Sequence, residues 1–191
     1  MLVYFEKAIL PSIFALSFAT VPAKPSYPPK IPDAREFTYK EASQTELKLW
    51  VFHSEEQTKG GKKPAIVFFF GGGWKGGTPT QFEKQCQYLA SRGMVAITAD
   101  YRVSSRHETK ATACVEDGKS AVRWIRQNAS KLGIDRNKVA AGGGSAGGHV
   151  AAAIASIDGF EPQGEDLGIS SVPNALVLFN PAVALDNIGK K

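Results

Sequence analysis

Hydrophobic and polar residues alternate in two early segments of the chain, whereas three later segments are almost continuously apolar. The alternation over 35–40 and 46–53 predicts two antiparallel strands that are half exposed to solvent. The apolar runs 65–70, 94–100 and 175–179 predict strands that are buried between helices on both faces of a sheet. The pattern therefore changes from an antiparallel pair to a sheet of buried strands.

Helices are predicted between these strands, because apolar residues recur there at helical spacing. The first helix is expected to start at Thr78 or Thr80 and to end near Gly93. The longest helix covers 109–131 and ends at Gly133. The candidate core positions of these two helices are Phe82, Cys86, Leu89, Ala90, Val115, Val122, Trp124 and Ile125.

A polar turn at 135–137 leads into a short strand that begins at Val139, and an alanine-rich helix starts at Ala146. Strands and helices thus alternate, which predicts an α/β domain with a mostly parallel sheet. In such sheets the functional site lies beyond the carboxyl ends of the strands. Two glycine-rich stretches, 71–73 and 143–148, follow strand ends, so we expect them to meet at one edge of the sheet.

The second glycine-rich stretch contains a serine at the junction of strand and helix. The segment Gly143-Gly-Ser-Ala-Gly147 matches the pattern G-x-S-x-G, in which a strained turn exposes the serine hydroxyl. The glycines allow strand and helix to pass closely, and the helix starting at Ala146 directs its unpaired N–H groups toward the same place. Because five-residue motifs recur by chance, a glycine-rich connector is the alternative interpretation.

The N-terminus has the features of an export signal. Lys7 precedes an apolar run over 8–19, and small residues suited to cleavage follow it. We therefore expect a signal peptide at 1–23, an extended, unpaired proline-rich linker at 24–33 and the α/β domain at 34–191. The apolar run is too short for a stable membrane anchor, so the expected location is secreted or periplasmic. A helix packed on the domain is the alternative for the run.

The composition fits one globular domain, with 191 residues, 43% hydrophobic and 21% charged. The net charge is +5, but no long basic run is present, so nucleic acid is not an expected partner. Three histidines and two cysteines lack metal-ligand spacing, so neither a metal nor another cofactor is expected. In an oxidising compartment Cys86 and Cys114 would be able to pair, although both also suit buried helix positions.

Five motifs, taken in order, make the sequence similar to a known group of enzymes. They are Phe70-Gly-Gly-Gly-Trp74, Asp100-Tyr-Arg102, the helix with Glu116-Asp117 and Ala121-Val-Arg-Trp124, Gly133-Ile-Asp135 and Gly143-Gly-Ser-Ala-Gly-Gly148. They resemble the α/β-hydrolase fold, in particular the serine esterases and lipases related to hormone-sensitive lipase and to feruloyl and acetyl esterases. The resemblance covers about 37–180 and implies a sheet flanked by helices.

The resemblance also implies roles for individual residues. Ser145 would be the nucleophile that becomes acylated. The backbone N–H groups of Gly72, Gly73 and Ala146 would form the oxyanion hole that binds the substrate oxygen. Trp74 would line the acyl or alcohol pocket, or else serve as an ordinary packing residue. The remaining glycines of the loop, Gly71, Gly76 and Gly77, would shape it.

Two features depart from the family pattern. Phe70 stands where the family usually has a histidine that braces the glycine loop, so an apolar contact is expected to replace it. The family order is serine, then acid, then histidine, but no histidine follows His149, which the helix carries away from the turn. His107 is a weak alternative base, and Asp186 is more typical of a turn than of the acid.

The missing acid and histidine suggest a chain that ends before the last strands and the C-terminal helix of the family. On this interpretation the strand at 175–179 is an exposed, aggregation-prone edge, and the chain by itself is inactive and poorly soluble. The leading hypothesis is a secreted esterase that cleaves a small-molecule or polysaccharide ester, of acetyl or feruloyl type. A formamidase or peptidase on the same fold is one alternative, and a non-catalytic binding protein or inactive fragment is the other.

Overall fold

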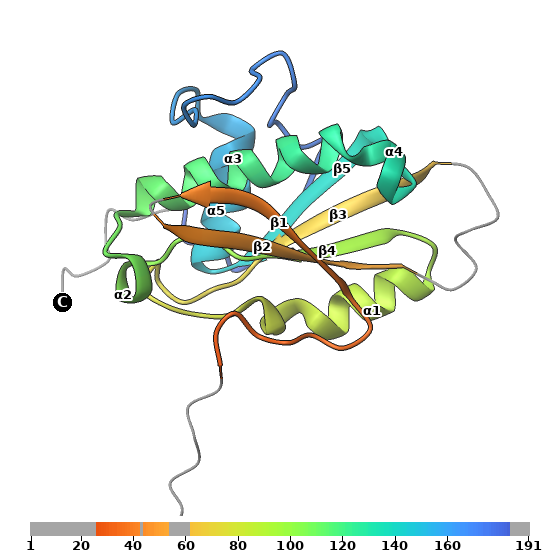
Figure 1. The fold of residues 1–191 in the computed structure, drawn as a ribbon, viewed down its shortest axis with the longest axis horizontal. Coiled ribbons are helices and arrows are strands. Elements are labelled where there is room, and N and C mark those ends of the chain that lie inside the picture. The colour runs from red at the N-terminus through yellow and green to blue at the C-terminus, as the bar shows by residue number, and fades with distance from the viewer. Residues whose placement is uncertain (1–25, 43, 54–61, 184–191) are drawn as a thin grey trace, which may run out of the picture.

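A sheet of six strands forms the centre of the fold (Figure 1). The computed structural model describes residues 26–42, 44–53 and 62–183. The strands are β1 (Arg35–Ala42), β2 (Thr45–Phe52), β3 (Lys63–Phe69), β4 (Val95–Ala99), β5 (Ile134–Gly144) and β6 (Ala175–Phe179). They lie in the order β1-β2-β4-β3-β5-β6, with β1 and β2 antiparallel to their neighbours and the other strands parallel. The predicted antiparallel pair therefore forms one margin of a mostly parallel sheet.

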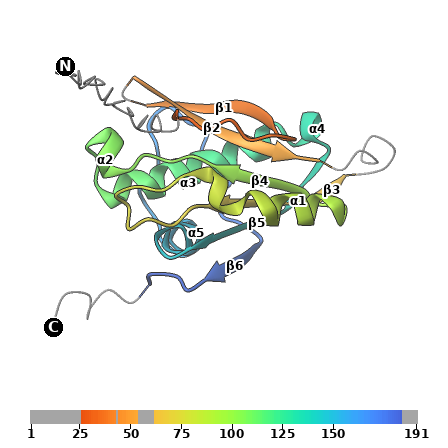
Figure 2. The same cartoon turned by 90° about the horizontal axis from the view of Figure 1, so that it is seen from below.

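Helices cover both faces of this sheet. They are the 3-10 helix η2 (Pro79–Phe82) and the α-helices α1 (Glu83–Ser91), α2 (Ser104–His107), α3 (Ala111–Gln127), α4 (Ala129–Leu132) and α5 (Ala146–Ser156). Helix α3 lies on one side of the strands and α1 on the other (Figure 1), and a view turned by 90° shows α5 and β6 at the margin away from β1 (Figure 2). The predicted α/β architecture, a mostly parallel sheet flanked by helices, is confirmed.

Alternate side chains of the central strand β3 enter two separate hydrophobic clusters. Val67 and Phe69 pack with residues of α3 and α5, whereas Ile66 and Phe68 pack with residues of η2 and α1. All four side chains are at most 2% exposed. A strand covered on both faces needs apolar residues at every position, which explains the continuous run in the sequence.

The two cysteines lie in these two different clusters. Cys86 is on α1 and Cys114 on α3, and both are buried free thiols. Because the sheet separates them, they do not pair, and the alternative of buried helix positions is the one observed. Burial raises the pKa of both thiols, that of Cys114 to about 12.

The predicted long helix is interrupted at Asn128. The Asn128 side chain donates a hydrogen bond to the carbonyl of Trp124 (2.9 Å) and separates α3 from α4, which ends at Gly133 with φ of 67°. The turn expected at 135–137 lies inside β5, where the pairing with β3 shifts register and Asp135 accepts a hydrogen bond from the Asn137 N–H. Side chains that bond to nearby backbone thus produce both departures from the predicted boundaries.

Two other local predictions differ from the structure. Thr78 stands at the N-cap position of η2, but its side chain makes no capping hydrogen bond, and neither threonine starts an α-helix. The last four residues of strand β2 are buried on both faces, whereas the sequence predicted a half-exposed strand. The face expected to be exposed carries Trp50 and Phe52, which pack in the cluster that contains Ile31. Strand β1, with alternating exposure, fits the prediction.

The part of 24–33 that the structure describes forms no helix and pairs with no strand, as predicted, but it packs on the domain. Ile31 is 6% exposed and belongs to the hydrophobic cluster around Phe68. The ring of Tyr27 stacks on the Arg106 guanidinium at 3.8 Å, and its hydroxyl donates to Asp100. These contacts hold the segment on the domain because one aromatic and one aliphatic side chain each find a partner. The predicted signal peptide at 1–23 lies outside the described residues.

Strand β6 is exposed along its whole length. The side chains of Leu176, Val177, Leu178 and Phe179 are between 37% and 46% exposed. The strand pairs with β5 through a parallel ladder on its other side. The exposure of this apolar strand agrees with the sequence-based expectation, and its tendency to aggregate stays a prediction. None of the helices in the described ranges has the length and apolar character needed to cross a membrane.

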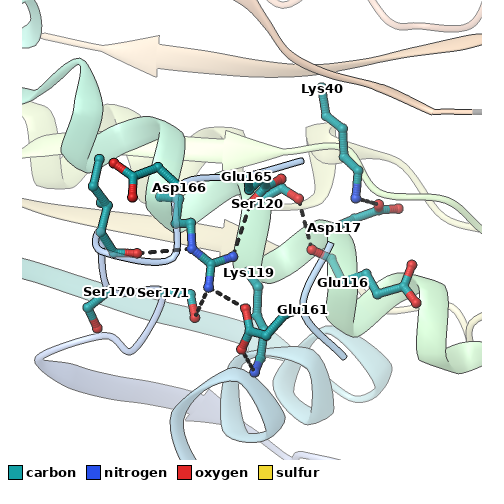
Figure 3. Close-up of polar contacts among 12 residues, drawn as sticks. Lys40, Glu116, Asp117, Lys119, Ser120, Glu161, Glu165, Asp166, Ser170 and Ser171 are labelled. Carbon is teal, nitrogen blue, oxygen red and sulfur yellow. Dashed lines mark hydrogen bonds and ion pairs between the residues drawn. The ribbon is translucent and has the colours of Figure 1, made fainter. Parts of the chain in front are cut away.

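Buried cations on α3 hold the long segment between α5 and β6 (Figure 3). Lys119, 3% exposed, donates to the carbonyls of Ile157 (3.1 Å) and Gly159 (2.6 Å). Arg123, 4% exposed, donates to the carbonyl of Ile169 (2.9 Å) and to Glu165 (3.0 Å). Both cations also contact Glu161. A segment with little secondary structure is thereby fixed by side chains that satisfy its backbone carbonyls.

Replacing the Arg123 guanidinium is expected to destabilise the segment between α5 and β6. The Arg123→Met substitution keeps the apolar stem but leaves the Ile169 carbonyl and Glu165 without this donor, while Glu161 keeps Lys119 as its partner. The loss should cost about 3 kcal/mol of unfolding free energy. Urea unfolding measures the loss. Lys138→Met is the matched control, because Lys138 is 67% exposed and lies 3.6 Å from Asp135, so its removal should cost less than about 1 kcal/mol. Equal stability of the two variants would contradict this account.

Candidate active site

Ser145 occupies a strained turn between β5 and α5. Its φ of 51° and ψ of −117° lie outside the regions that non-glycine residues usually adopt, and the residue is exposed. The Ser145 N–H donates to the carbonyl of Phe179 (3.0 Å), and its carbonyl accepts from the N–H groups of His149 (3.0 Å) and Ala182 (3.1 Å). The main chain is therefore fixed on both sides, while the hydroxyl makes no hydrogen bond to the described residues.

The glycines on either side of Ser145 allow the main chain to pack without side chains. A Cβ added at Gly147 would lie 2.0 Å from the carbonyl oxygen of Phe69, and one at Gly143 would lie 2.4 Å from the carbonyl carbon of Gly147. Side chains at these positions would push α5 away from β3. We call residues 143–147 the serine turn.

A second loop, residues 71–77, lies directly against the serine turn, and we call it the glycine loop. Gly71 is buried, and a Cβ added there would lie 2.9 Å from the Gly144 carbonyl oxygen and 3.4 Å from the Ser145 Cβ. Gly72 and Gly73 follow with φ of 144° and 62°, and both are exposed. The structure thus brings the two glycine-rich stretches together at one sheet edge, as the sequence predicted.

Three backbone N–H groups at this junction are available to a ligand. Within the described residues, the N–H groups of Gly72, Gly73 and Ala146 donate no hydrogen bond. Ala146 is the first residue of α5, where N–H groups have no partner in the helix and the helix dipole favours negative charge. The carbonyl of Gly72 is occupied, since it accepts from Lys75 (3.1 Å) and Gly76 (3.2 Å). The junction therefore presents donors rather than acceptors.

The Phe70 side chain supports the start of the glycine loop by stacking. Its ring lies 4.1 Å from that of Tyr101 with 16° between the planes, and both side chains are fully buried. The Tyr101 hydroxyl donates to the Phe70 carbonyl (2.5 Å). At the other end of the loop, Arg106 donates to the Gly77 carbonyl (2.9 Å). At position 70, where the family histidine is expected, the stacking on Tyr101 and the hydrogen bond from its hydroxyl support the backbone instead.

Gln81, on η2, contacts the same loop and was not identified from the sequence. Its amide group accepts a hydrogen bond from the Gly71 N–H (2.9 Å) and donates one to the Gly71 carbonyl (3.0 Å). A glutamine near the start of a predicted helix has no pattern that distinguishes it from a solvent-exposed residue. The contact between Gln81 and Gly71 becomes apparent only in the structure, where η2 lies next to the loop.

Asp100 is a buried acid behind the glycine loop. Its carboxylate accepts hydrogen bonds from the Tyr27 hydroxyl and the Tyr101 N–H (2.8 Å), and Arg106 lies 3.8 Å away. Burial raises the pKa of Asp100 to about 6, although the hydrogen bond from Tyr27 and the charge of Arg106 act in the opposite direction. Because these partners also hold the loop, Asp100 belongs to its support.

The other acidic motif residue, Asp117, is the centre of a buried charge cluster. Arg102 contacts both Asp117 carboxylate oxygens at 2.8 Å, and Lys40 lies 2.8 Å from one of them. Asp117 also accepts a hydrogen bond from the Arg102 N–H (2.9 Å). These bonds tie α3 to β1 and to the segment after β4. The Asp-Tyr-Arg and Glu-Asp motifs therefore have structural roles here.

Trp74 and His149 form a pair beside the serine turn. The Trp74 indole N–H lies 3.4 Å from His149 Nδ1, and the rings meet edge to face with centroids 5.2 Å apart. Burial lowers the pKa of His149, which favours the neutral ring that accepts this bond. His149 is thus held by Trp74 and by its own helix, as expected for a packed histidine.

None of the three histidines hydrogen-bonds the Ser145 hydroxyl. His107 Nδ1 accepts from the Val103 N–H (2.9 Å), and burial and the charge of Arg106 lower its pKa. His53 Nε2 lies 3.1 Å from the Leu132 carbonyl, at the opposite end of the sheet strands from the serine turn. Asp186 lies outside the described residues. No group of three or more side chains suited to a metal gathers within 26–42, 44–53 and 62–183.

Adding one methyl group to the serine turn tests its packing. We expect Gly147→Ala to lower the free energy of unfolding by about 3 kcal/mol, because the new Cβ meets the Phe69 main chain rather than a movable side chain. Gly76→Ala is the matched control, since the nearest atom to its Cβ is Ser105 Oγ at 3.9 Å, and it should change stability by less than about 1 kcal/mol. Thermal unfolding compares the two, and a tolerated Gly147→Ala would refute the close contact.

Asp100 should make stability depend on pH. Because its pKa is higher in the folded protein than in the unfolded chain, the folded state binds the proton more tightly between about pH 4 and 6. Its stabilisation is complete below about pH 4 and falls by up to about 3 kcal/mol as the pH rises through 6. The Tm of the wild type minus that of Asp100→Asn should therefore decrease from pH 4 to 7. A constant or increasing difference would contradict this assignment.

Comparisons with known proteins identify the family of the chain. The BD-FAE family model matches residues 52–172. Carboxylesterase NlhH of Mycobacterium tuberculosis is 33% identical over 95 residues, which cover 49% of this chain and 29% of that protein. Esterase LipC of the same organism is 38% identical over 101 residues, covering 52% of this chain and 24% of LipC.

Solved structures give a longer match. Native esterase 2 of Thermogutta terrifontis superposes with a TM-score of 0.82 and 49% identity, covering 87% of this chain and 59% of that one. The same esterase has been solved phosphorylated by paraoxon. The chain thus spans less than a third of these two curated relatives and about three fifths of the esterase structure. It belongs to the BD-FAE family, among the esterases and lipases of the α/β-hydrolase fold.

Proposed function

We propose that the protein is a serine hydrolase that cleaves carboxylic esters through an acyl-enzyme at Ser145. The observation that carries the proposal is the junction of the two loops, where an exposed serine stands beside three backbone N–H groups that donate to none of the described residues. A serine and such donors are the two parts that acyl transfer needs for attack and for charge stabilisation. The esterases among the relatives support the reaction class.

In the proposed reaction, the Ser145 oxygen bonds to the ester carbonyl carbon and its proton passes to a general base. The carbonyl oxygen becomes negatively charged and accepts hydrogen bonds from the N–H groups of Gly72, Gly73 and Ala146. The bond to the alcohol oxygen then breaks, and the alcohol leaves with a proton. Water attacks the acyl-enzyme in the same way and releases the carboxylic acid and Ser145.

The proton transfer is the step for which the described residues offer no group. Each of the three histidines bonds elsewhere, and the pKa values of His107 and His149 are lowered. A hydroxyl without a base is a poor nucleophile at neutral pH. This observation favours a second candidate, a hydrolase-like protein that binds an ester or acid without cleaving it.

The proposed substrates are esters of acetyl or feruloyl type, including those on carbohydrate. The half-buried indole of Trp74 contacts His149, which lies one helical turn after Ser145, and it offers a flat apolar surface beside the serine turn. Such a surface suits a feruloyl ring or the apolar face of a sugar. A polymeric carbohydrate substrate agrees with the proposed secreted or periplasmic location.

Substitution of the proposed nucleophile separates the two candidates. The protein in its full natural length should hydrolyse 4-nitrophenyl acetate and methyl ferulate, and Ser145→Ala should lower kcat/KM by about 10³-fold or more without changing Tm. Paraoxon should add a diethylphosphoryl group to Ser145 of the wild type, detected by peptide mass spectrometry. An N-formyl anilide in the same panel tests the amidase alternative.

The contrary result is equally informative. If the wild type neither hydrolyses an ester nor reacts with paraoxon, while it binds ferulate by calorimetry, the binding candidate replaces the enzyme. If Ser145→Ala retains the wild-type rate of hydrolysis, Ser145 is not the nucleophile.

A further inference from the structure

We propose that Gln81 is a positioning residue for the proposed oxyanion hole, and this inference rests on the proposed esterase function. Gln81 does not reach the reacting atoms. It holds the main chain of Gly71, the residue that precedes both loop donors and lies against the Ser145 side chain. Its effect would therefore be on the placement of the Gly72 and Gly73 N–H groups.

The contact between Gln81 and Gly71 has two hydrogen bonds in opposite directions. The Gly71 N–H donates to Gln81 Oε1 (2.9 Å), and Gln81 Nε2 donates to the Gly71 carbonyl (3.0 Å). Two hydrogen bonds from one side-chain amide to both main-chain groups of Gly71 restrict the orientation of this residue as well as its distance, unlike a single bond. An amide supplies one donor and one acceptor, so neither a carboxylate nor an apolar side chain reproduces the pair.

The position of Gly71 transmits this restraint to the reaction centre. A Cβ added at Gly71 would lie 3.4 Å from the Ser145 Cβ and 2.9 Å from the Gly144 carbonyl oxygen, so the Gly71 main chain runs too close to the serine turn to leave room for a side chain. Any shift of Gly71 moves the next two N–H groups relative to Ser145. Hydrogen-bond donors in such sites act through their fixed geometry, so small displacements are costly.

Gln81 itself stands on a rigid base. Its neighbours in η2, Pro79 and Phe82, are buried, and the Thr98 hydroxyl donates to the Pro79 carbonyl (2.8 Å). The Phe82 ring stacks on Phe68 of β3 with centroids 4.7 Å apart and 2° between the planes. The glutamine therefore connects the loop after β3 to a helix that is anchored on β3 and β4.

The remainder of the loop has its own supports. Tyr101 bonds to Phe70 before Gly71, and Arg106 bonds to Gly77 at the loop's end. Because Gln81 is largely exposed, its replacement removes little buried surface. Loss of Gln81 should consequently alter the placement of Gly71 more than the stability of the fold, and this difference separates positioning from a purely structural role.

The kinetic test compares three variants of the full-length protein. Gln81→Leu removes both hydrogen bonds and should lower kcat for 4-nitrophenyl acetate by about 10- to 100-fold, with KM within about twofold and Tm nearly unchanged. Gln87→Leu is the control, because Gln87 is an exposed glutamine on the adjoining helix α1, and it should retain the wild-type kcat.

Gln81→Glu adds a pH readout. An ionised glutamate accepts from the Gly71 N–H but faces the Gly71 carbonyl without a proton, whereas a protonated one restores the donor. The ratio of its kcat to that of the wild type should therefore rise as the pH falls from 8 to 5. The wild-type kcat in Gln81→Leu, or a kcat ratio of Gln81→Glu that does not depend on pH, would overturn the proposal. The proposal would also fail if kcat fell in proportion to Tm in both Gln81 variants.

Hydrogen exchange of the Gly71 amide, followed by NMR, tests the positioning independently of activity. The exchange rate should increase at least about tenfold in Gln81→Leu and stay unchanged in Gln87→Leu. If the wild type hydrolyses no ester, the proposed function fails, and this measurement still decides whether Gln81 holds the loop. An unchanged Gly71 rate in Gln81→Leu would refute the inference even in an active enzyme.

Discussion

The close approach of two stretches of main chain, at Phe69 and Gly147, is the constraint on which the site geometry depends. A side chain at Gly147 would reach to 2.0 Å from the Phe69 carbonyl oxygen, so α5 can lie this near β3 only without one. Since Phe69 ends β3 and Gly147 belongs to the first turn of α5, the contact places the glycine loop beside Ser145. The parallel strands β3 and β5 place the loops that follow them at the same edge of the sheet. The glycines then allow these two loops to come into contact.

Buried charges then fix the elements around this contact. Asp117 joins α3 to β1 through Lys40 and to the segment after β4 through Arg102, while Asp100 connects that segment to Tyr27 and Arg106. A buried carboxylate is costly unless it is well bonded, and these two differ in that respect. Asp117 faces two cations at 2.8 Å, whereas the nearest cation to Asp100 is 3.8 Å away. With Arg106 at this distance, burial outweighs the lowering effects of the Tyr27 hydrogen bond and the Arg106 charge, so the pKa of Asp100 is raised.

Most of the fold and the location of the candidate site could be predicted from the sequence, because both depend on local patterns. Continuous apolar runs mark strands covered on two faces, and Gly143 to Gly147 marks a turn whose backbone permits few other residues. Contacts between segments distant in sequence left no such pattern. In the sequence, Tyr27 in a proline-rich stretch and Arg123 in an amphipathic helix both resemble solvent-exposed residues. In the structure, Tyr27 contacts Arg106, and Arg123 bonds to the segment before β6. The break at Asn128 depends on a single side-chain bond that competes with helix propensity.

The replacement of histidine by Phe70 shows how the support of the glycine loop is distributed. A histidine would hold the loop through its ring nitrogens, but a phenylalanine ring offers only stacking, and here it stacks on Tyr101, whose hydroxyl bonds to the Phe70 carbonyl. The polar contacts to the loop therefore come from the tyrosine, from Arg106 and from Gln81, each at a different loop position. Because these groups act on the backbone rather than on one side chain, the conformation of Gly72 and Gly73 does not require a histidine at position 70.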